Sequence, residues 1–288
     1  MTTISNKDEI NYLEFLNLVK NTGIKKNTRN GITYSHFAHL LKFNISDKFP
    51  LLTTKKMFFK GIVEELLWFL RGSVNSKELE SKGVNIWKGN SSREFLDANG
   101  FFNYDEGYLG PIYGYQWRSF NGKIDQLKYL LEEIQLENSR RILINAWNPC
   151  QLHEQALPPC HILYNFFKNN DEISCMMYMR SSDLFLGLPF NIASTALLTH
   201  IIAKVSGFKV KDIAISICDC HIYDEHIEPL NIQLERIPYE FPSIHIKKEI
   251  DINHLSINEK IKWIEELKFE DFELINYNYY PTIKAIMK

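Results

Sequence analysis

The chain has 288 residues, of which 45% are hydrophobic, 13% aromatic and 24% charged, a composition typical of a globular protein with a sizeable core. Its formal net charge is −2, which excludes a global basic field for nucleic acid, so any anionic ligand must be held by local arginines. No apolar run reaches the roughly eighteen residues of a membrane span, the polar start predicts no signal peptide, and the five cysteines are an odd number, so we expect a reducing, cytoplasmic location.

Hydrophobic periodicity predicts helices and strands in an irregular order along the chain. Residues 1–22 end in a helical pattern, in which Tyr12, Phe15, Leu16 and Val19 recur at helical spacing. The Asn-Gly pair within residues 27–32 predicts a hairpin turn. Further helices are predicted at 61–70, 124–137, 193–205 and 258–267, the last within a tail of strand and loop. Strands are predicted at 142–147, 162–167, 173–179, 213–217 and 232–236.

This order of elements lacks the regular βαβα alternation and the Gly-rich loop of a dinucleotide-binding fold. It also lacks an internal repeat, a low-complexity tract and a Gly/Ser linker. We therefore expect an α+β fold with a large mixed or antiparallel sheet packed by helices. Residues 1–288 should form a single domain, in which residues 1–9 are the most flexible part.

The predicted helix at 61–70 is almost wholly apolar around two glutamates, Glu64 and Glu65. A carboxylate in a buried helix is expensive unless it has a partner or a chemical task. The sequence therefore predicts a partner or a task for this pair.

Residues 157–161 read Leu-Pro-Pro-Cys-His and contain the strongest candidate for a catalyst. The thiolate of cysteine is a strong nucleophile, and the two prolines fix the backbone before Cys160 and remove two amide donors. Because arginines elsewhere in the chain can stabilise a thiolate, Cys160 is a candidate covalent nucleophile. The alternative is a buried structural cysteine, which is the role of most lone cysteines.

Four arginines and a serine form a candidate phosphate site. Arg29 lies in the predicted turn, Arg140 and Arg141 precede a predicted strand, and Arg180 is followed by Ser181. Guanidinium groups bind phosphate through paired hydrogen bonds and stay charged. Each arginine taken alone is more often a solvated surface charge, and adjacent residues on a strand point to opposite faces, so spacing alone does not assemble this site.

The segment 180–191 sets polar groups among apolar ones. Gly187 and Pro189 predict a turn that lets a ligand approach the backbone. The amide of Asn191 offers the donor and the acceptor that suit a pyrimidine edge. The alternative is an ordinary loop in which Asn191 caps the helix predicted at 193–205.

A third candidate segment, residues 218–223, reads Cys-Asp-Cys-His-Ile-Tyr. His221 and Tyr223 share one face of a strand and can hydrogen-bond a sugar hydroxyl. Cys218, Cys220 and His221 also permit a zinc site, but a single residue between the cysteines is shorter than the usual spacing and a second pair is missing. We therefore expect small apolar packing for Cys175, Cys218 and Cys220, and no bound metal.

Seven motifs, in order, carry a resemblance to a known family: FPLLTTKKMFFKGIVEELLWFLRGSVN, LGPIYGYQWR, SRRILINAWNP, ALPPCH, RSSDLFLGLPFNIAS, HIYDEHIEPL and NYNYYPTIK. From about residue 10 to its end, the chain resembles a thymidylate synthase. Separate motifs in the right order over nearly the whole length make this resemblance specific. It implies a single α+β domain that dimerises through its sheet, and we expect no room in 288 residues for an attached dihydrofolate reductase domain.

The activity implied by the resemblance is reductive methylation of dUMP to dTMP, catalysed by a methyltransferase. The co-substrate would be 5,10-methylenetetrahydrofolate, which supplies the one-carbon unit and the hydride and leaves as dihydrofolate. Cys160 matches the thiolate that adds to C6 of the uracil. Arg180 should lower the pKa of that thiol, since a nearby cation favours the charged form.

Other matched residues surround the pyrimidine ring. Asn191 matches the residue that holds the N3–O4 edge and so prefers uracil over cytosine. Glu65 matches the carboxylate that relays protons through water near O4, and His161 and Asn148 fit the same polar network. Tyr113 matches the tyrosine next to C5, where a proton must leave.

Two further sets of residues match ligand contacts in the family. The phosphate ligands match Arg29, Arg180, Ser181 and, from a partner subunit, Arg140 and Arg141, while the sugar 3′-hydroxyl matches His221 and Tyr223. The folate pocket matches Ile86, Trp87, Asn90, Asp183, Leu186, Gly187 and Phe190, whose apolar members would stack on the folate rings. A phosphate site shared between subunits implies an obligatory homodimer.

The chain departs from the family pattern at several positions. The family usually has glutamines at Met176 and Met179, a residue that is often arginine at Cys150, and asparagine at Glu225. The run from Cys218 to Cys220 is also unusual, and the chain ends in Lys288 rather than in a short apolar tail. Because Met179 precedes a phosphate arginine, an altered ligand affinity is one expectation.

Two alternative functions stay open at the level of sequence. The first is a pyrimidine nucleotide hydroxymethylase, in which water rather than hydride captures the methylene group; Asn191 argues for uracil but does not exclude this product. The second is a catalytically inactive structural or RNA-binding relative, with weak RNA binding as a further partner. The presence of Cys160, Glu65, Tyr113 and Asn191 argues against an inactive scaffold, which has no chemical need for them.

Overall fold

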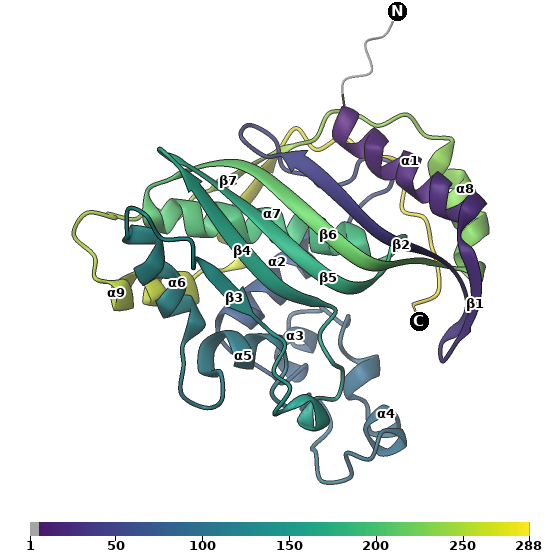
Figure 1. Ribbon diagram of the computed structural model, residues 1–288, viewed down its shortest axis with the longest axis horizontal. Coiled ribbons are helices and arrows are strands. Elements are labelled where there is room, and N and C mark those ends of the chain that lie inside the picture. The colour runs from purple at the N-terminus through teal and green to yellow at the C-terminus, as the bar shows by residue number, and fades with distance from the viewer. Residues whose placement is uncertain (1–5, 288) are drawn as a thin grey trace, which may run out of the picture.

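A computed structural model describes residues 6–287, whose centre is a six-stranded sheet with the strand order β1-β2-β6-β5-β4-β3 (Figure 1). Its strands are β1 (Ile24–Thr28), β2 (Gly31–Asn44), β3 (Leu143–Asn145), β4 (His161–Asn169), β5 (Glu172–Asp183) and β6 (Lys209–Tyr223). Strands β5 and β6 run parallel, and the other four neighbouring pairs are antiparallel. The predicted α+β fold with a mixed sheet is therefore confirmed. A smaller sheet pairs β7 (Ser243–Ile246) with β8 (Phe272–Ile275).

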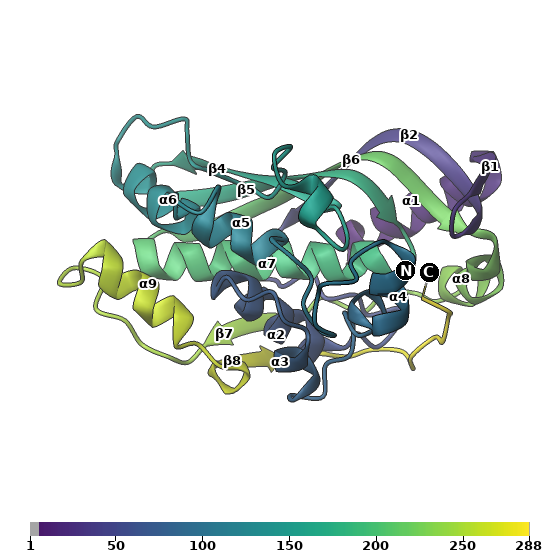
Figure 2. The same cartoon turned by 90° about the horizontal axis from the view of Figure 1, so that it is seen from below.

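The helices lie on one side of the large sheet (Figure 2). They are α1 (Lys7–Thr22), α2 (Phe59–Leu70), α3 (Lys77–Glu80), α4 (Arg93–Ala98), α5 (Tyr113–Ser119), α6 (Gln126–Gln135), α7 (Gly187–Ser206), α8 (Ile227–Leu234) and α9 (Ile257–Glu265). On β5 the residues Ile173, Cys175 and Met177 face the helices and are buried, whereas Met176 between them is exposed. This alternation is what one packed face and one open face require.

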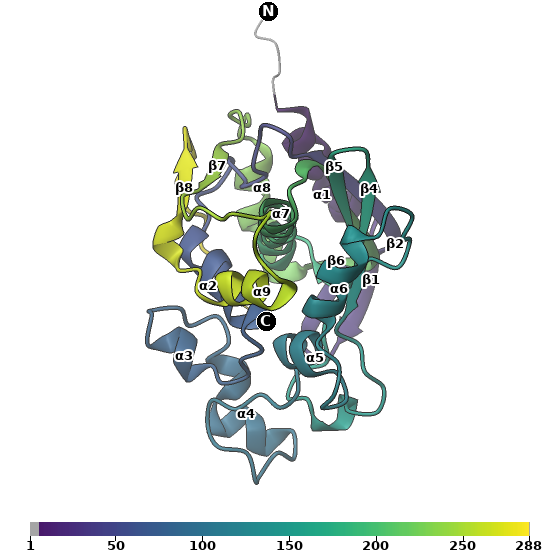
Figure 3. The same ribbon diagram turned by 90° about the vertical axis from the view of Figure 1, so that its left-hand side faces the viewer.

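Helix α7 is the central layer of the molecule. It lies between the large sheet and a third layer made of α2, α9 and the β7–β8 sheet (Figures 2 and 3). It is apolar on nearly all sides, and a helix of that kind must be buried. By length and composition α7 could cross a membrane, but 78% of its apolar window is buried inside the protein, so it is a core helix.

The first helix is tied to the segment that precedes α2. Asn6 caps α1 by accepting a hydrogen bond from the Glu9 backbone. The Glu9 carboxylate is fully buried and accepts hydrogen bonds of 2.7–3.0 Å from the backbone and hydroxyl groups of Thr53 and Thr54. The rest of the segment predicted to be flexible, residues 1–5, lies outside the described residues, as does Lys288.

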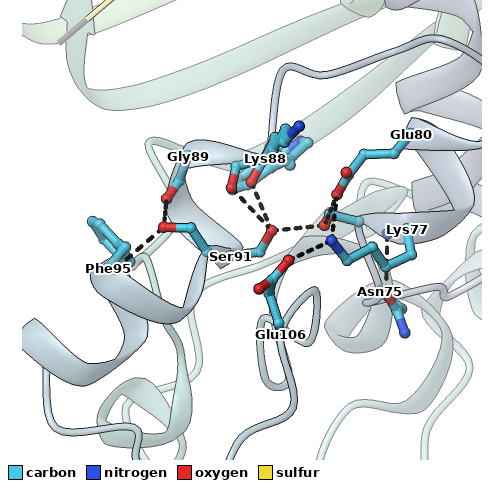
Figure 4. A network of polar contacts seen from close by, with 11 residues as sticks. Asn75, Lys77, Glu80, Lys88, Gly89, Ser91, Phe95 and Glu106 are labelled. Carbon is cyan, nitrogen blue, oxygen red and sulfur yellow. Dashed lines mark hydrogen bonds and ion pairs between the residues drawn. The ribbon is translucent and has the colours of Figure 1, made fainter.

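A polar network braces the chain between α2 and α5 (Figure 4). The Ser76 and Ser91 hydroxyl oxygens lie 2.6 Å apart, and Ser76 donates to Glu80 at 3.0 Å. Ser91 also donates to the Trp87 carbonyl at 3.0 Å. These contacts hold the loop that carries Trp87 against α3.

Two local predictions are wrong. Residues 232–234 of the strand predicted at 232–236 belong to helix α8, in which Leu230 and Gln233 are buried three residues apart. A short apolar run fits the period of a helix as well as that of a strand. Helix α7 begins at Gly187, six residues before the predicted start, so Asn191 lies inside the helix and does not cap it. The other predicted helices and strands all overlap observed ones, although those predicted at 124–137, 142–147 and 258–267 extend beyond the observed ends, and the turn at 27–32 is the β1–β2 hairpin.

Candidate active site

Cys160 is the residue just before β4, held between the ends of two strands. The Arg180 backbone N–H donates to the Cys160 carbonyl at 3.0 Å. The Arg180 guanidinium donates to the carbonyls of Pro158 and Pro159 at 2.9 and 2.8 Å and lies 3.7 Å from the Cys160 sulfur. The two prolines thus supply carbonyl acceptors as well as a rigid backbone. The predicted pairing of Cys160 with Arg180 is present.

The pKa of the Cys160 thiol is higher than usual. Burial raises it, and the nearby Arg180 guanidinium and Tyr113 hydroxyl lower it by less. The sequence correctly predicted the direction of the Arg180 effect, but it missed the larger effect of burial. A thiol in this state is mostly protonated at neutral pH, so ionisation must be completed by the reacting complex.

Tyr113 and His161 line the side of Cys160. The Tyr113 hydroxyl oxygen accepts the Cys160 backbone N–H at 2.7 Å, and its ring stacks on the His161 imidazole with the centroids 4.3 Å apart. Burial raises the pKa of Tyr113 well above its usual range and lowers the pKa of His161 to about 3. Both groups are therefore neutral at pH 7, and His161 is hydrogen-bonded to the Tyr164 hydroxyl at 3.0 Å.

The two adjacent glutamates on α2 have different surroundings. The buried Glu64 carboxylate pairs with the Lys82 ammonium at 2.6 Å. The Glu65 carboxylate instead accepts a hydrogen bond from the Trp87 indole at 2.7 Å, and burial raises its pKa to about 7. A carboxyl group that titrates near neutral pH suits proton transfer. Glu64 therefore has the charged partner that a buried carboxylate needs, whereas Glu65 has a pKa that suits a chemical role.

A cavity of about 180 Å³ opens beside the β1–β2 hairpin. Four residues of the predicted nucleotide site line it, namely Arg29, Ser181, His221 and Tyr223. Ser181 of this cavity follows Arg180, whose guanidinium lies 3.7 Å from the Cys160 sulfur. The structure therefore brings these four residues together on the Arg180 side of Cys160.

The sequence missed five further polar residues of this cavity, of which Thr28 and Asn30 lie in the β1–β2 hairpin itself. Thr33, Ser35 and Asp219 also line it. In the β2–β6 ladder Thr33 lies opposite Tyr223 and Ser35 opposite His221. The alternation of hydroxyl residues after the Asn-Gly turn was the available signal, but it required β2 to be identified as a strand.

Arg140 and Arg141 do not reach this cavity within their own chain. Both are exposed in the segment between α6 and β3, and neither lines the cavity. Because the segment is irregular rather than a strand, the expected alternation of the two side chains does not apply. Their placement is compatible with a role toward a second subunit, as the sequence predicted.

The predicted folate residues come from two regions. The loop after α3 carries Ile86, Trp87 and Asn90, and the start of α7 carries Leu186, Gly187 and Phe190. Trp87 is buried, and the other five residues are partly exposed. Asp183 Oδ1 accepts the backbone N–H groups of Phe185 and Leu186 at 3.0 and 3.3 Å. Burial alone would raise the Asp183 pKa, but His226 and these hydrogen bonds outweigh it, so the pKa is lowered and the group is anionic.

Comparison with known proteins agrees with this site. The family described as "Thymidylate synthase" matches residues 10–288. The chain belongs to the thymidylate synthase family. It is 45% identical to the thymidylate synthase of Homo sapiens over 293 residues, which covers 97% of this chain and 90% of that protein.

Two other relatives show the range of the family. The thymidylate synthase of varicella-zoster virus (strain Dumas) is 42% identical over 294 residues, covering 97% of this chain and 94% of the viral protein. The bifunctional dihydrofolate reductase-thymidylate synthase of Leishmania amazonensis is 44% identical over 299 residues, covering 98% of this chain and 55% of the relative. The family predicted from the seven sequence motifs is thus confirmed.

Some features of this thymidylate synthase differ from the sequence-based expectation. Asn148 is buried and its amide contacts Gln116, Asn121 and Gln151 at 2.7–3.0 Å, so it belongs to a polar cluster beside the site, with no contact to Glu65 among the described residues. The Asn191 side-chain amide makes no hydrogen bond within residues 6–287 and is partly exposed.

The methionine and cysteine departures have a simple explanation where they are buried. Met179 packs in the core and pairs with His161 across β4 and β5, so no buried polar group is left without a partner there. Of the three cysteines predicted to serve as small apolar packing, Cys175 and Cys220 are buried, whereas Cys218 is only half-buried. Within residues 6–287, no three His, Cys, Asp or Glu side chains are grouped so that they could hold a metal ion.

Proposed function

We propose that this thymidylate synthase methylates dUMP to dTMP through a covalent bond between the Cys160 sulfur and C6 of the pyrimidine. The methylation is the activity of the family to which the chain belongs, and the proposal concerns the residues that perform it. The observation that carries it is the position of Cys160 between the Arg180 guanidinium and the Tyr113 hydroxyl. The cation and the hydroxyl both lower the pKa of the thiol and so favour the thiolate that reacts.

The nucleotide would lie across the cavity, with its phosphate at the Arg29 hairpin. Arg29 and Ser181 offer charged and neutral donors to the phosphate, and His221 and Tyr223 offer hydrogen bonds to the sugar. The Asn191 amide would donate to O4 and accept from N3–H. Cytosine presents the opposite pattern at these two atoms, so it would leave buried polar groups unpaired.

The residues around Cys160 support the steps that follow. Addition of the thiolate to C6 forms the S–C6 bond and moves the C5–C6 electron pair toward O4, which makes C5 nucleophilic. Glu65, with a pKa of about 7, can share a proton with O4 through water. After the one-carbon unit is attached, the C5 proton leaves near the neutral Tyr113 hydroxyl. The S–C6 bond breaks and releases the thiolate only after the one-carbon unit has separated from the folate and accepted a hydride from it.

We propose that the folate residues named above enclose 5,10-methylenetetrahydrofolate. When bound, this co-substrate supplies the one-carbon unit and the hydride. The anionic Asp183 carboxylate fits a ring that presents N–H donors, and the partly exposed apolar side chains around it fit an aromatic ring system. The C-terminal residues would fold over this pocket and exclude water, so that the hydride arrives before water does.

We also propose a homodimer formed through the open face of the sheet. On that face Phe167 and Met176 are 67% and 45% exposed, and Phe37 on β2 is 81% exposed. Exposed apolar side chains of this size mark an interaction surface. A second copy that covers them would also bring its Arg140 and Arg141 toward the phosphate, which completes a site that one chain leaves short of cations. A cytoplasmic location stays a prediction.

The proposed reaction is tested by its product. The chain is incubated with dUMP and 5,10-methylenetetrahydrofolate, and the nucleotide product is identified by mass. We expect a methyl product and an equal amount of dihydrofolate. A hydroxymethyl product would assign the chain to the water-capturing alternative, and unchanged dUMP with a folded protein would indicate an inactive relative.

A further inference from the structure

His226 connects the folate pocket to the C-terminal tail. It ends the short helix Asp224–His226 that precedes α8, and its side chain is fully buried. Its Nε2 lies 2.8 Å from the carbonyl oxygen of Ile286, and its Nδ1 lies 3.6 Å from Asp183 Oδ1. The ring is fixed between Phe185 and Tyr223, each with its centroid 5.4 Å away.

The tail has few other attachments near its end. Upstream, the Tyr280 backbone donates to the Thr53 carbonyl and Arg236 donates to the Pro281 carbonyl, both at 2.8 Å. Beyond Pro281, the bond from His226 to Ile286 is the one hydrogen bond that the described residues provide. Ile286 itself is 65% exposed, so apolar packing does not hold this position. Figure 1 shows the yellow tail running beside α8.

The geometry sets the position of the protons on His226. A carbonyl oxygen only accepts, so Nε2 must carry a proton. In a neutral ring Nδ1 would then present a lone pair toward the Asp183 carboxylate. In the protonated ring, Nδ1–H points a positive charge at that carboxylate, which is the favourable arrangement.

The charged and titratable groups around His226 agree with a protonated ring. Burial lowers its pKa, but the Asp183 carboxylate and the Ile286 carbonyl raise it by more, and the result is a raised pKa. Lys55, from the segment before α2, opposes this through its charge, although burial lowers the pKa of Lys55 itself to about 7. The neutral Tyr223 phenol lies on another side of the ring. The short helix that contains His226 also contains Asp224 and Glu225, and Asp224 accepts a hydrogen bond from Tyr34 at 2.9 Å.

We propose that His226 is a positioning residue that holds the tail closed over the folate pocket, by joining the Ile286 carbonyl to the Asp183 carboxylate. The proposal rests on the proposed role of the tail as a lid. We call the contacts of His226 with Ile286 and Asp183 the latch. Because Asp183 belongs both to the latch and to the proposed folate pocket, folate binding and tail closure should strengthen each other. His226 is fully buried, and in this proposal it acts through the residues that it aligns.

The test compares His226→Phe, which keeps an aromatic ring between Phe185 and Tyr223, with His226→Gln, which keeps a neutral donor. His254→Phe is the control, because this histidine is exposed and pairs only with Asp251 among the described residues. Tail closure is measured as the rate at which a broad-specificity carboxypeptidase releases the terminal residues in the complex with 5-fluoro-dUMP and folate. The KM for folate, the Kd for dUMP and the ratio of methyl to hydroxymethyl product are measured beside it.

For His226→Phe we expect faster release of the tail, a KM for folate raised about tenfold, some hydroxymethyl product and an unchanged Kd for dUMP. His226→Gln should restore most of the closure and should lose the pH dependence of wild type, in which closure weakens as the pH rises above the His226 pKa. If deleting residues 286–288 changes the product but both His226 variants release the tail at the wild-type rate, the latch is wrong and the lid stands. If the deletion leaves the methyl yield unchanged, the lid itself is wrong.

Discussion

At the scale of single residues, neighbouring side chains of the same type have separate functions because their partners differ. Glu64 and Glu65 follow each other on one helix, yet only Glu64 has a cation at 2.6 Å. Glu65 has an indole donor and a pKa of about 7. Burial without a charged partner therefore gives Glu65 the pKa that its proposed role in proton transfer requires.

Glu65→Gln should stabilise the fold above pH 7 and lower the turnover. The folded chain raises the Glu65 pKa from 4.5 to about 7, so the stabilisation gained from the protonated form is complete below 4.5 and is lost as the pH rises through about 7. Glutamine keeps the acceptor for Trp87 but cannot ionise, so the free energy of unfolding at pH 8 should rise by roughly 2–3 kcal/mol. Turnover should fall about 100-fold or more.

Urea unfolding at pH 5 and pH 8 measures this effect. The control is Glu64→Gln, which breaks the ion pair with Lys82 and should destabilise the chain at pH 8. A Glu65→Gln variant that gains no more stability at pH 8 than at pH 5 would show that the ionised Glu65 is not costly.

Asn191→Asp should shift the base preference from uracil toward cytosine. An aspartate accepts from the N4 amino group of cytosine, whereas the wild-type amide pairs with the N3–O4 edge of uracil. The ratio of kcat/KM for dUMP to that for dCMP should fall at least about tenfold, while Asn231→Asp on the exposed face of α8 should leave it unchanged. A wild-type chain that already prefers dCMP would refute this role of Asn191.

At the scale of secondary structure, α7 both fills the core and positions the site. Leu198→Ala in this helix should lower the free energy of unfolding by about 2–5 kcal/mol, because Leu198 is fully buried and its loss leaves a cavity. Ile237→Ala, at a position that is 71% exposed, should change it by less than about 0.5 kcal/mol. Urea unfolding at one protein concentration measures both variants, and equal small effects would mean that α7 is not the packed core.

The elements that could be predicted from sequence are those with long, unambiguous periodicity. The apolar run of α7 was sufficient to predict a helix, and the alternation of β4 and β5 was sufficient to predict two strands. Strand β2 was missed because its pattern is irregular: Ala38 has a left-handed backbone with φ 61°, and the β2–β6 pairing skips this residue between Phe37 and His39. Without β2, the sequence did not reveal that Thr33 and Ser35 face His221 and Tyr223.

The site was predicted from motifs more completely than from spacing. The family resemblance named Cys160, Arg180, Tyr113 and Glu65, and these four lie together in the structure. It did not give the raised pKa of the Cys160 thiol, since the degree of burial depends on how distant segments pack. It also did not reveal the contact of His226 with Ile286, because these residues are 60 positions apart and no local pattern joins them.

At the scale of the whole molecule, the account requires a second copy of the chain. A mixture of Cys160→Ser and Arg141→Ala chains should regain activity as heterodimers form, because one site in each mixed dimer has both the thiol and the partner arginine. After subunit exchange the activity should reach about a quarter of the wild-type value. Arg29 serves its own chain's site in this account, so a mixture of Cys160→Ser with Arg29→Ala should stay inactive. Equal behaviour of the two mixtures would refute the shared site.

The central claim is that Cys160 forms the covalent bond, and the most direct measurement traps that bond. The chain is incubated with 5-fluoro-dUMP and 5,10-methylenetetrahydrofolate, digested, and the modified peptide is identified by mass spectrometry. We predict one adduct, on the peptide that contains Cys160, and no adduct in Cys160→Ser, which should still bind dUMP. An adduct on Cys150 or on any other residue, or an adduct that persists in Cys160→Ser, would contradict the account.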